Sequence, residues 1–312
     1  MKRISFLFAL GILISACGSE STPQSSDNLI STGSGENFIW PGLEKNTEPD
    51  DYGYLLDSAV EGLRYISGQH YGVTGSDGKF GYIFGENIEF YIGNSLIASA
   101  STPKALLTPL ELSVKSPFSA YEVLRLLQSL DDDGNPNNGI QITQAVHDLA
   151  ETVVIEPLTV SFDDIQPYVS FDHIDPDVIM ELTAVTIAGP RAVVTEFDAL
   201  NHFESTLDSL INDIEGDIQS LADESTCTSN DQCDYTELET RYTFHCPSSG
   251  PSIIFSKNDL DQLKFDALIA ERKHLVELRK SFQPPDNTTG LCFTNKPPIF
   301  LVCNVSNHCE LE

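Results

Sequence analysis

The expected fold rests on residues 60–94, which read VEGLRYISGQHYGVTGSDGKFGYIFGENIEFYIGN. Short runs of alternating apolar and polar side chains are separated here by glycine-containing turns, and Asp77-Gly78 lies between two such runs. Alternation with a period of two is typical of half-buried β-strands, and Asp-Gly between alternating runs indicates a hairpin. The pattern extends over residues 55–112. We therefore expect four to six strands in a small antiparallel β-sandwich at residues 52–113.

Residues 72–80, Gly-Val-Thr-Gly-Ser-Asp-Gly-Lys-Phe, match the pattern Gly-x-Thr-x-x-Asp-Gly-x-Phe throughout. On these residues the segment resembles the carboxypeptidase-regulatory or transthyretin-like Ig modules of uncharacterised bacterial surface lipoproteins. In those modules the pattern is a strand-turn-strand signature. The resemblance implies a structural or adhesive module without catalytic residues, and hence a protein that is not an enzyme.

Residues 114–312 are expected to be mostly helical. Apolar residues at helical spacing predict helices at residues 119–130, 143–151, 196–223 and 259–282. Thr195 is the expected N-cap of the first long helix, whereas Ser256 and Asp259 stand at capping-box spacing before the second. Pro284-Pro285 should end that helix. Residues 152–194 receive no assignment, and the fold class is α+β.

The N-terminus has the features of an export signal. Lys2 and Arg3 precede an apolar run over residues 4–14, which is much shorter than the ~20 residues needed to span a bilayer. Residues 14–17, Ile-Ser-Ala-Cys, resemble the lipobox of bacterial lipoproteins. That resemblance implies a signal peptide at residues 1–16 and a mature chain whose Cys17 carries the lipid, including palmitate. The alternative is an ordinary signal peptide followed by a free thiol.

In bacterial lipoproteins an aspartate after the lipidated cysteine retains the protein at the inner membrane. This chain has Gly18 there, so the resemblance implies sorting to the outer membrane, where the protein faces either the periplasm or the cell surface. Residues 17–51 are rich in small polar side chains and are expected to form a flexible tether.

Acidic residues number 47 against 17 basic ones, which gives a net charge of −30. Because this charge repels phosphates, we expect no nucleic-acid partner. The expected partners are the membrane, through the lipid anchor, and an envelope protein or extracellular partner.

Apart from Cys17, the cysteines gather in the last part of the chain. They are Cys227, Cys233, Cys246, Cys292, Cys303 and Cys309. An even number in an exported chain predicts three disulfides, and spacing alone leaves fifteen pairings open. Zinc is disfavoured because no Cys-x2-Cys spacing occurs. The disulfide-rich part is expected at residues 227–309.

An acidic loop at residues 131–139 follows the first predicted helix. Oxygen-bearing side chains alternate in it at Asp131, Asp133, Asn135 and Asn137. Such alternation suits a structural calcium ion, although Ile142 stands where an EF-hand has its bidentate glutamate. The alternative is an acidic turn that closes the helix. No other cofactor is expected.

Recognisable catalytic motifs are missing from the sequence. It contains no Gly-x-Ser-x-Gly, no His-Glu-x-x-His and no phosphate-binding loop, and its seven histidines have no metal-ligand spacing, so each is expected at the surface or in a cap. We therefore expect a lipid-anchored envelope or cell-surface protein with a structural, adhesive or interaction role. The first alternative is a periplasmic protein that binds a small ligand or calcium. An enzyme of unrecognised type is the third possibility.

Overall fold

The computed structural model describes residues 46–112, 116–158, 173–241, 249–281 and 299–312. Within these residues the chain is mixed α+β, with small, mostly antiparallel sheets, helices and a disulfide-crosslinked C-terminal part, so the predicted fold class is confirmed. The predicted signal peptide, Cys17 and the tether up to residue 45 lie outside the described residues.

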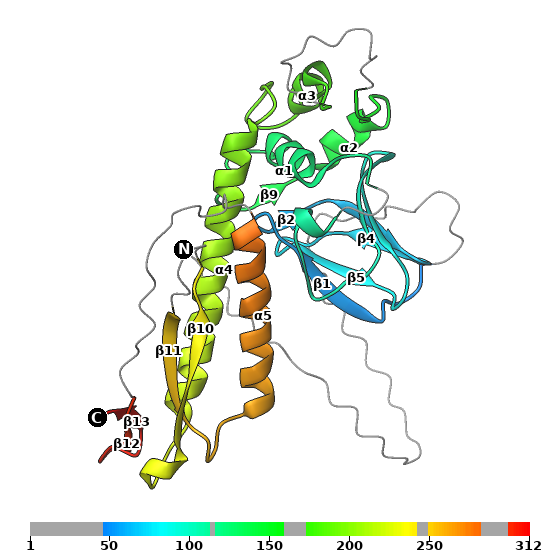
Figure 1. Cartoon of the computed structure of the whole chain (residues 1–312). Coiled ribbons are helices and arrows are strands. Elements are labelled where there is room, and N and C mark those ends of the chain that lie inside the picture. The colour runs from blue at the N-terminus through cyan, green and yellow to red at the C-terminus, as the bar shows by residue number, and fades with distance from the viewer. Residues whose placement is uncertain (1–45, 113–115, 159–172, 242–248, 282–298) are drawn as a thin grey trace, which may run out of the picture. The chain divides into compact units, whose positions relative to one another are not determined.

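The N-terminal strands form two sheets (Figure 1). One has the order β5-β1-β8, and the other has the order β4-β3-β6-β7. Their bounds are β1 Asp51–Leu55, β3 Arg64–Ser67, β4 His70–Val73, β5 Lys79–Tyr82, β6 Ile88–Ile92, β7 Ser95–Ala100 and β8 Leu106–Leu107. Two of the connections are the short turns that the sequence predicts, at Gly68 between β3 and β4 and at Gly93 between β6 and β7, both with φ of 59°.

The Asp77-Gly78 turn does not close a hairpin, so that prediction is wrong. Strand β4 pairs with β3, whereas β5 pairs with β1, with Asp51 opposite Tyr82. The turn therefore connects the two sheets. Alternation identifies a strand but not its partner, which depends on contacts distant in sequence. Strand β8 also departs from the antiparallel expectation, because it pairs with β1 in parallel.

Residues 46–50, which the sequence placed in the tether, already contact the sheets. Asn46 Nδ2 donates to Tyr71 O, and Tyr71 N donates to Asn46 Oδ1. Thr47 N donates to Gln69 O. Among the described residues, the chain is thus held against β4 from Asn46 onward.

The predicted helices are present, and α4 begins directly after Thr195, its expected N-cap. Their bounds are α1 Ala120–Ser129, α2 Gln144–Ala150, α4 Glu196–Glu224 and α5 Gln262–Ser281. Ser119 and Glu122 form a reciprocal capping box on α1, while Thr143 and Thr195 cap α2 and α4. The previously unassigned segment contains α3, Pro176–Thr183, capped by Asp175.

The capping box predicted for α5 is wrong. Asp259 instead accepts hydrogen bonds from the backbone and hydroxyl of Thr226, and Asp261 Oδ1 accepts from Lys264 N at the start of α5. Ser256 lies in strand β11, Ser249–Ser256, so its backbone is committed to a sheet. Pro284-Pro285 lies outside the described residues.

One buried cluster joins the two N-terminal sheets to α1, α2 and α3. It includes Phe80 and Phe90 from the sheets, Leu126 from α1, Val146 from α2 and Ile179 from α3. The cluster continues across the predicted boundary at residues 113–114. The β-module and the first helices therefore bury their apolar side chains together.

Helix α4 lies beside α5 (Figure 1), and its apolar stripe is buried as core packing requires. Phe203, Leu207 and Ile211 pack with α1 and α5, whereas Ile218 packs with Phe255 and Phe265. Between the two long predicted helices the chain forms a β-hairpin that the sequence analysis does not predict, made of β10, Cys233–Glu239, and β11. A second hairpin, β12 Leu301–Cys303 with β13 Cys309–Leu311, ends the chain.

His147 contradicts the expectation of surface or capping histidines. It is buried on α2, where Nδ1 accepts from Gly93 N at 2.9 Å and Nε2 contacts Gly62 O at 2.8 Å. Burial lowers the pKa of His147 to about 4. The neutral imidazole thus ties α2 to two glycine turns of the β-module.

No helix in the described part of the chain is long and apolar enough to cross a bilayer.

Candidate functional site

The acidic loop lies between α1 and the short strand β9, Ile140–Gln141. Strand β9 pairs in parallel with β2, Val60–Glu61, so that Val60 stands beside Ile140 and Glu61 beside Gln141. Gly134 and Gly139 have positive φ values of 71° and 114°, which side-chain-bearing residues rarely adopt. The two glycines let the loop turn back onto the β-module.

Asp131 is 1% exposed. Its Oδ1 accepts from Gln141 N at 2.8 Å, whereas its Oδ2 has no hydrogen-bond partner among the described residues. Burial, and then the neighbouring Asp133 carboxylate, raise the pKa of Asp131. A buried, unpartnered carboxylate oxygen next to a second carboxylate is an environment that a proton or a cation stabilises.

The predicted calcium ligands form two pairs in place of one converging set. Asp131 lies beside Asp133, and Asn137 Nδ2 donates to Asn135 Oδ1 at 3.1 Å. Asp133 is further engaged within the loop, because Oδ1 accepts from Asn135 N and Oδ2 accepts from Asn138 Nδ2, both at 2.8 Å. The Asn138 bond, above all, lowers the pKa of Asp133.

Two partners of the loop carry no signal in the sequence. Asp132 Oδ1 accepts from Ile187 N at 3.1 Å. Arg191 Nε donates to Ser129 O at 2.7 Å, and its Nη2 donates to Asp131 O. The segment after α3 thereby supplies a counter-charge that no local pattern reveals.

A cavity of about 260 Å³ opens beside this loop. Its acidic lining comes from Glu61, Asp131, Asp132 and Asp133. Among the described residues, no three of its carboxylate or imidazole groups bring ligand atoms within 4.8 Å of one another. The geometry therefore suits a cation that keeps part of its water shell, more than a closed cage of carboxylates.

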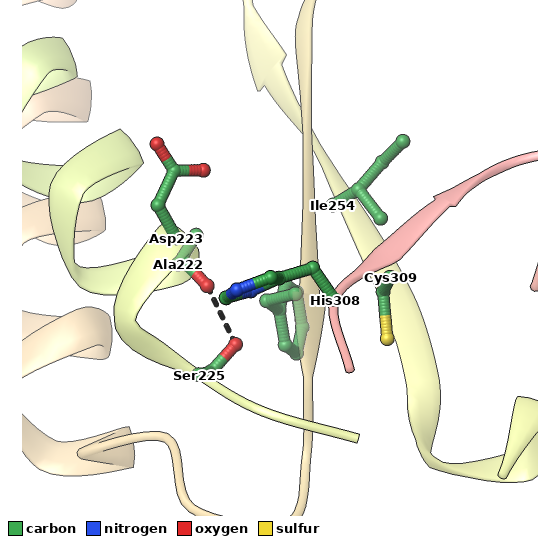
Figure 2. Close-up of a pocket in the computed structure, with 7 residues that line it drawn as sticks. Ala222, Asp223, Ser225, Ile254, His308 and Cys309 are labelled. Atoms are coloured by element: carbon green, nitrogen blue, oxygen red, sulfur yellow. Dashed lines mark hydrogen bonds between the residues drawn. The ribbon is translucent and has the colours of Figure 1, made fainter. Parts of the chain in front are cut away.

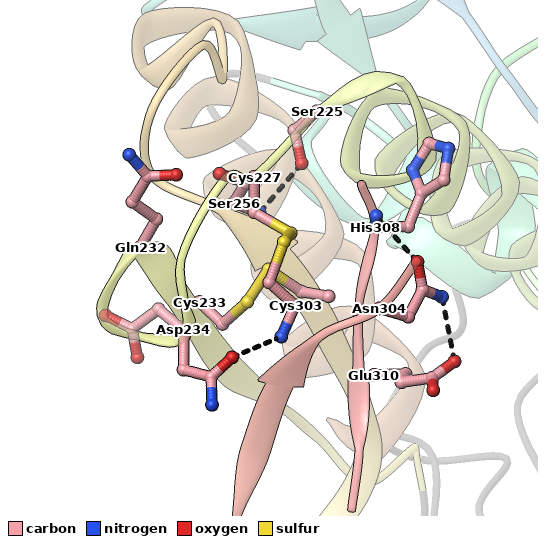
Figure 3. The surroundings of a disulfide bond; sticks show 12 residues. Ser225, Cys227, Gln232, Cys233, Asp234, Ser256, Cys303, Asn304, His308 and Glu310 are labelled. Atoms are coloured by element: carbon pink, nitrogen blue, oxygen red, sulfur yellow. Dashed lines mark hydrogen bonds between the residues drawn. A yellow bond between two sulfur atoms is a disulfide. The ribbon is translucent and has the colours of Figure 1, made fainter. Parts of the chain in front are cut away.

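Two of the expected disulfides are present (Figure 3). Cys227 pairs with Cys303, with Cα atoms 5.8 Å apart, and Cys233 pairs with Cys309, at 5.5 Å. The prediction of disulfides is thus confirmed for these four residues. Cys246 and Cys292 lie outside the described residues.

A second cavity, of about 230 Å³, lies next to these disulfides (Figure 2). It is lined by Ala222, Asp223 and Ser225 at the end of α4, by Ile254 and Phe255 of β11, and by His308 and Cys309. Cys309, a member of the second disulfide, is therefore one of the residues that line this cavity.

A buried polar cluster connects the β-module to α1 and α4. Asp57 is fully buried, and its Oδ2 accepts from Gln128 Nε2 at 2.8 Å. Its Oδ1 lies 3.8 Å from His202 Nε2, which also contacts Ser58 Oγ at 3.1 Å. Sequence inspection missed this cluster, because Asp57-Ser58 has the composition of an ordinary exposed turn.

The Ser58–His202–Asp57 arrangement does not reproduce a catalytic triad. In a triad the acid binds the ring nitrogen opposite the serine, whereas here Ser58 and Asp57 approach the same nitrogen. His202 Nδ1 is buried and has no partner among the described residues. We therefore regard the cluster as a structural joint.

No protein-family model, curated protein or solved structure matches this chain significantly. The resemblances to lipoproteins and Ig-like modules accordingly remain predictions from sequence.

Proposed function

We propose that this protein is an exported, lipid-anchored envelope protein of the outer membrane with a structural or interaction role. The observation that carries the proposal is the pair of disulfides, each of which joins residues 76 positions apart. Disulfides of this kind persist in oxidising compartments, in agreement with the export signal and with Cys17 at the end of the lipobox-like segment. Acyl chains on Cys17 would anchor the folded part without a membrane-spanning helix.

Replacing Cys17 tests the anchor directly. In a Gram-negative host fed an alkyne analogue of palmitate, we expect the wild-type chain to be labelled and to fractionate with outer membranes. The Cys17→Ser variant should be unlabelled, because the thioether that starts acylation cannot form. Cys246→Ser is the matched control and should keep its label. An unlabelled wild-type chain, or label retained by Cys17→Ser, contradicts the proposal.

An interaction role is better tested by surface substitutions than by deleting the β-module. The module shares its buried cluster with α1, α2 and α3, so deletion of residues 52–112 would expose that cluster. Loss of binding after such a deletion would report unfolding.

A second candidate function is cation binding at the acidic loop. The specific observation in its favour is that Asp131 lines the acidic cavity and that its buried Oδ2 has no hydrogen-bond partner in the described part of the chain. A calcium ion there would offset the repulsion between Asp131 and Asp133. Its role would be to stabilise the junction of α1 with β2, at the millimolar affinity of extracellular modules.

Thermal unfolding of the full chain with and without 10 mM Ca²⁺ tests this second function. For a Kd of about 1 mM, linkage predicts about 1.4 kcal/mol of stabilisation, or a rise of a few degrees in Tm. Asp133→Asn should abolish the rise, whereas Asp213→Asn, an exposed carboxylate on α4, should retain it. Equal shifts with Mg²⁺ and in both variants would indicate screening of the net charge alone. That outcome, or no shift, rejects the site.

A further inference from the structure

The two disulfides lie against each other. The Sγ atoms of Cys227, Cys233 and Cys309 are all within 4.8 Å of one another, although Cys227 is bonded to Cys303. Figure 3 shows both bonds at the junction of the segment 227–233 with the hairpin β12–β13. A thiolate generated at Cys233 would therefore already be close to the sulfur of the other disulfide.

The same residues permit a second pairing. Cys303 stands directly opposite Cys309 in the β12–β13 ladder. The flanking bonds, from Asn304 N to His308 O and from Glu312 N to Phe300 O, place Cys303 and Cys309 at a non-hydrogen-bonded position. Opposed Cα atoms at such positions are about 4.5 Å apart, which is within the range that a disulfide bridges. Cys227 and Cys233 form the complementary pair.

The hairpin lies outside the apolar cores of the protein. None of its residues belongs to the three buried apolar clusters of the described chain. Cys227 N donates to Asn307 O at 2.8 Å, and Cys303 N donates to Asn230 Oδ1 at 2.9 Å. Within the described residues, the hairpin also contacts β10, β11 and the 3-10 turn Asn230–Gln232, and the two disulfides are its covalent links to the segment 227–233.

Access to the cluster is asymmetric. Cys227 and Cys233 are buried, whereas Cys303 and Cys309 are partly exposed. Cys309 also borders the 230 Å³ cavity in Figure 2, which has room for a small thiol. Since Cys309 is the partly exposed cysteine that also lines this cavity, we expect an external thiol to attack there, with the buried Cys233 as the leaving sulfur.

We propose that these four cysteines form a thiol-disulfide exchange site, at which a low-molecular-weight thiol converts the Cys227–Cys303 and Cys233–Cys309 pairs into Cys227–Cys233 and Cys303–Cys309. This inference is independent of the proposed anchor and of the acidic loop.

Three displacements complete the exchange. The external thiolate attacks Cys309 Sγ, and the bond to Cys233 breaks, so that Cys233 leaves as a thiolate. Cys233 then attacks Cys227 Sγ and expels Cys303 as a thiolate. Cys303 finally attacks Cys309 Sγ, closes Cys303–Cys309 and returns the external thiolate. The thiol is regenerated, no sulfur is oxidised or reduced overall, and the hairpin loses both covalent links to the segment 227–233.

Disulfide mapping of the full chain in detergent tests the exchange. The sequence contains no Lys or Arg between residues 192 and 240, so one tryptic peptide, 192–241, contains both Cys227 and Cys233. In the starting protein this peptide is linked to the C-terminal peptide that contains Cys303 and Cys309. After incubation with substoichiometric glutathione and acid quenching, we expect an unlinked peptide 192–241 with an internal disulfide. Residues 301–311 should then lose protection from hydrogen exchange.

A single variant tests the central step without external thiol. In Cys309→Ser, Cys233 begins as a free thiol beside the Cys227–Cys303 bond. At pH 8 the proposal predicts that alkylation moves from Cys233 to Cys303, whereas a sample held at acid pH remains labelled at Cys233. Exclusive labelling of Cys233 at pH 8 overturns the proposal. In the wild type, the proposal is also overturned if the four cysteines form disulfides with Cys246 and Cys292 as readily as with one another, because exchange would then not be confined to this cluster.

Discussion

Asp57→Asn should make the protein more stable than the wild type by an amount that grows with pH up to about pH 8. Asp57 is fully buried, and burial raises its pKa from 3.8 to about 8, while the hydrogen bond from Gln128 offsets only part of the shift. An amide is isosteric and neutral. It keeps an oxygen for Gln128 and never has to lose a proton in a dry environment.

The sign follows from proton linkage. Between pH 3.8 and about 8 the unfolded chain has lost the Asp57 proton, whereas the folded chain retains it. The unfolded state therefore binds fewer protons, and wild-type stability falls with rising pH by up to about 1.4 kcal/mol per unit. The total is on the order of 5 kcal/mol across the window. Below pH 3.8 the contribution is fully present, and above pH 8 it is lost.

The titration of His202 changes the pH dependence of stability in the opposite direction, so its effect must be separated from that of Asp57. Burial lowers the pKa of His202, so the neutral ring gives Asp57 no counter-charge at neutral pH. Its own contribution to stability is lost as the pH falls below 6.5, because the unfolded histidine then takes up a proton. Taking the difference in free energy of unfolding between variant and wild type, from urea titrations at pH 6.5 to 9, largely cancels this effect.

The matched control is Asp213→Asn, which removes an exposed carboxylate from α4, the helix that carries His202. Its free-energy difference from the wild type should change little with pH. A flat profile for Asp57→Asn would mean that Asp57 is ionised in the folded protein, contrary to the expectation from its burial.

Glu215→Gln should destabilise the protein by about 3 kcal/mol. Arg272 on α5 is 1% exposed, and its Nε and Nη2 donate to Glu215 Oε1 at 2.9 and 2.7 Å. Nη2 also donates to Glu239 O at 2.7 Å, and Glu215 Oε2 accepts a hydrogen bond from a second arginine, Arg241. Removing the carboxylate leaves the Arg272 charge buried without its counter-ion, which typically costs 3–5 kcal/mol. Because the Glu215 side chain is 19% exposed and water can partly replace it, we expect a cost at the lower end of this range.

The control uses an exposed pair on the same helix. Lys273 and Glu277 are 3.9 Å apart, and both side chains are more than half exposed. Glu277→Gln should therefore cost no more than about 0.5 kcal/mol in the same urea titration. The double replacement Glu215→Leu with Arg272→Met should recover part of the loss, because the buried Arg272 charge is removed together with its counter-ion, and Arg241, which also loses Glu215, is partly exposed to water. A loss below 1 kcal/mol for Glu215→Gln would show that water reaches Arg272.

Local sequence was sufficient for most of the secondary structure. The strands around Phe80 and Phe90 and the helix stripe that includes Phe203 follow from the period of their apolar side chains. The N-cap Thr195 follows from a hydrogen bond within one helical turn, to Asp198 N. Helix α3 was missed because it is short and therefore has few positions at which an apolar period can be recognised. The β10–β11 hairpin lies in a region that was expected to be mostly helical, and its two strands pair across a connection that no short turn motif marks.

By itself, then, the sequence determined the positions of the N-terminal strands and of the helices α1, α2, α4 and α5, the excess of negative charge and the expectation of disulfides, because period, composition and cysteine number are properties of the chain alone. Only the tertiary structure decided that β5 joins β1, that Arg191 meets Asp131, that Asp57 lies against His202, and that Cys227 pairs with Cys303. Each of these contacts joins groups whose environment is created by other segments packing around them. Burial and partner choice are consequences of folding that no local window contains.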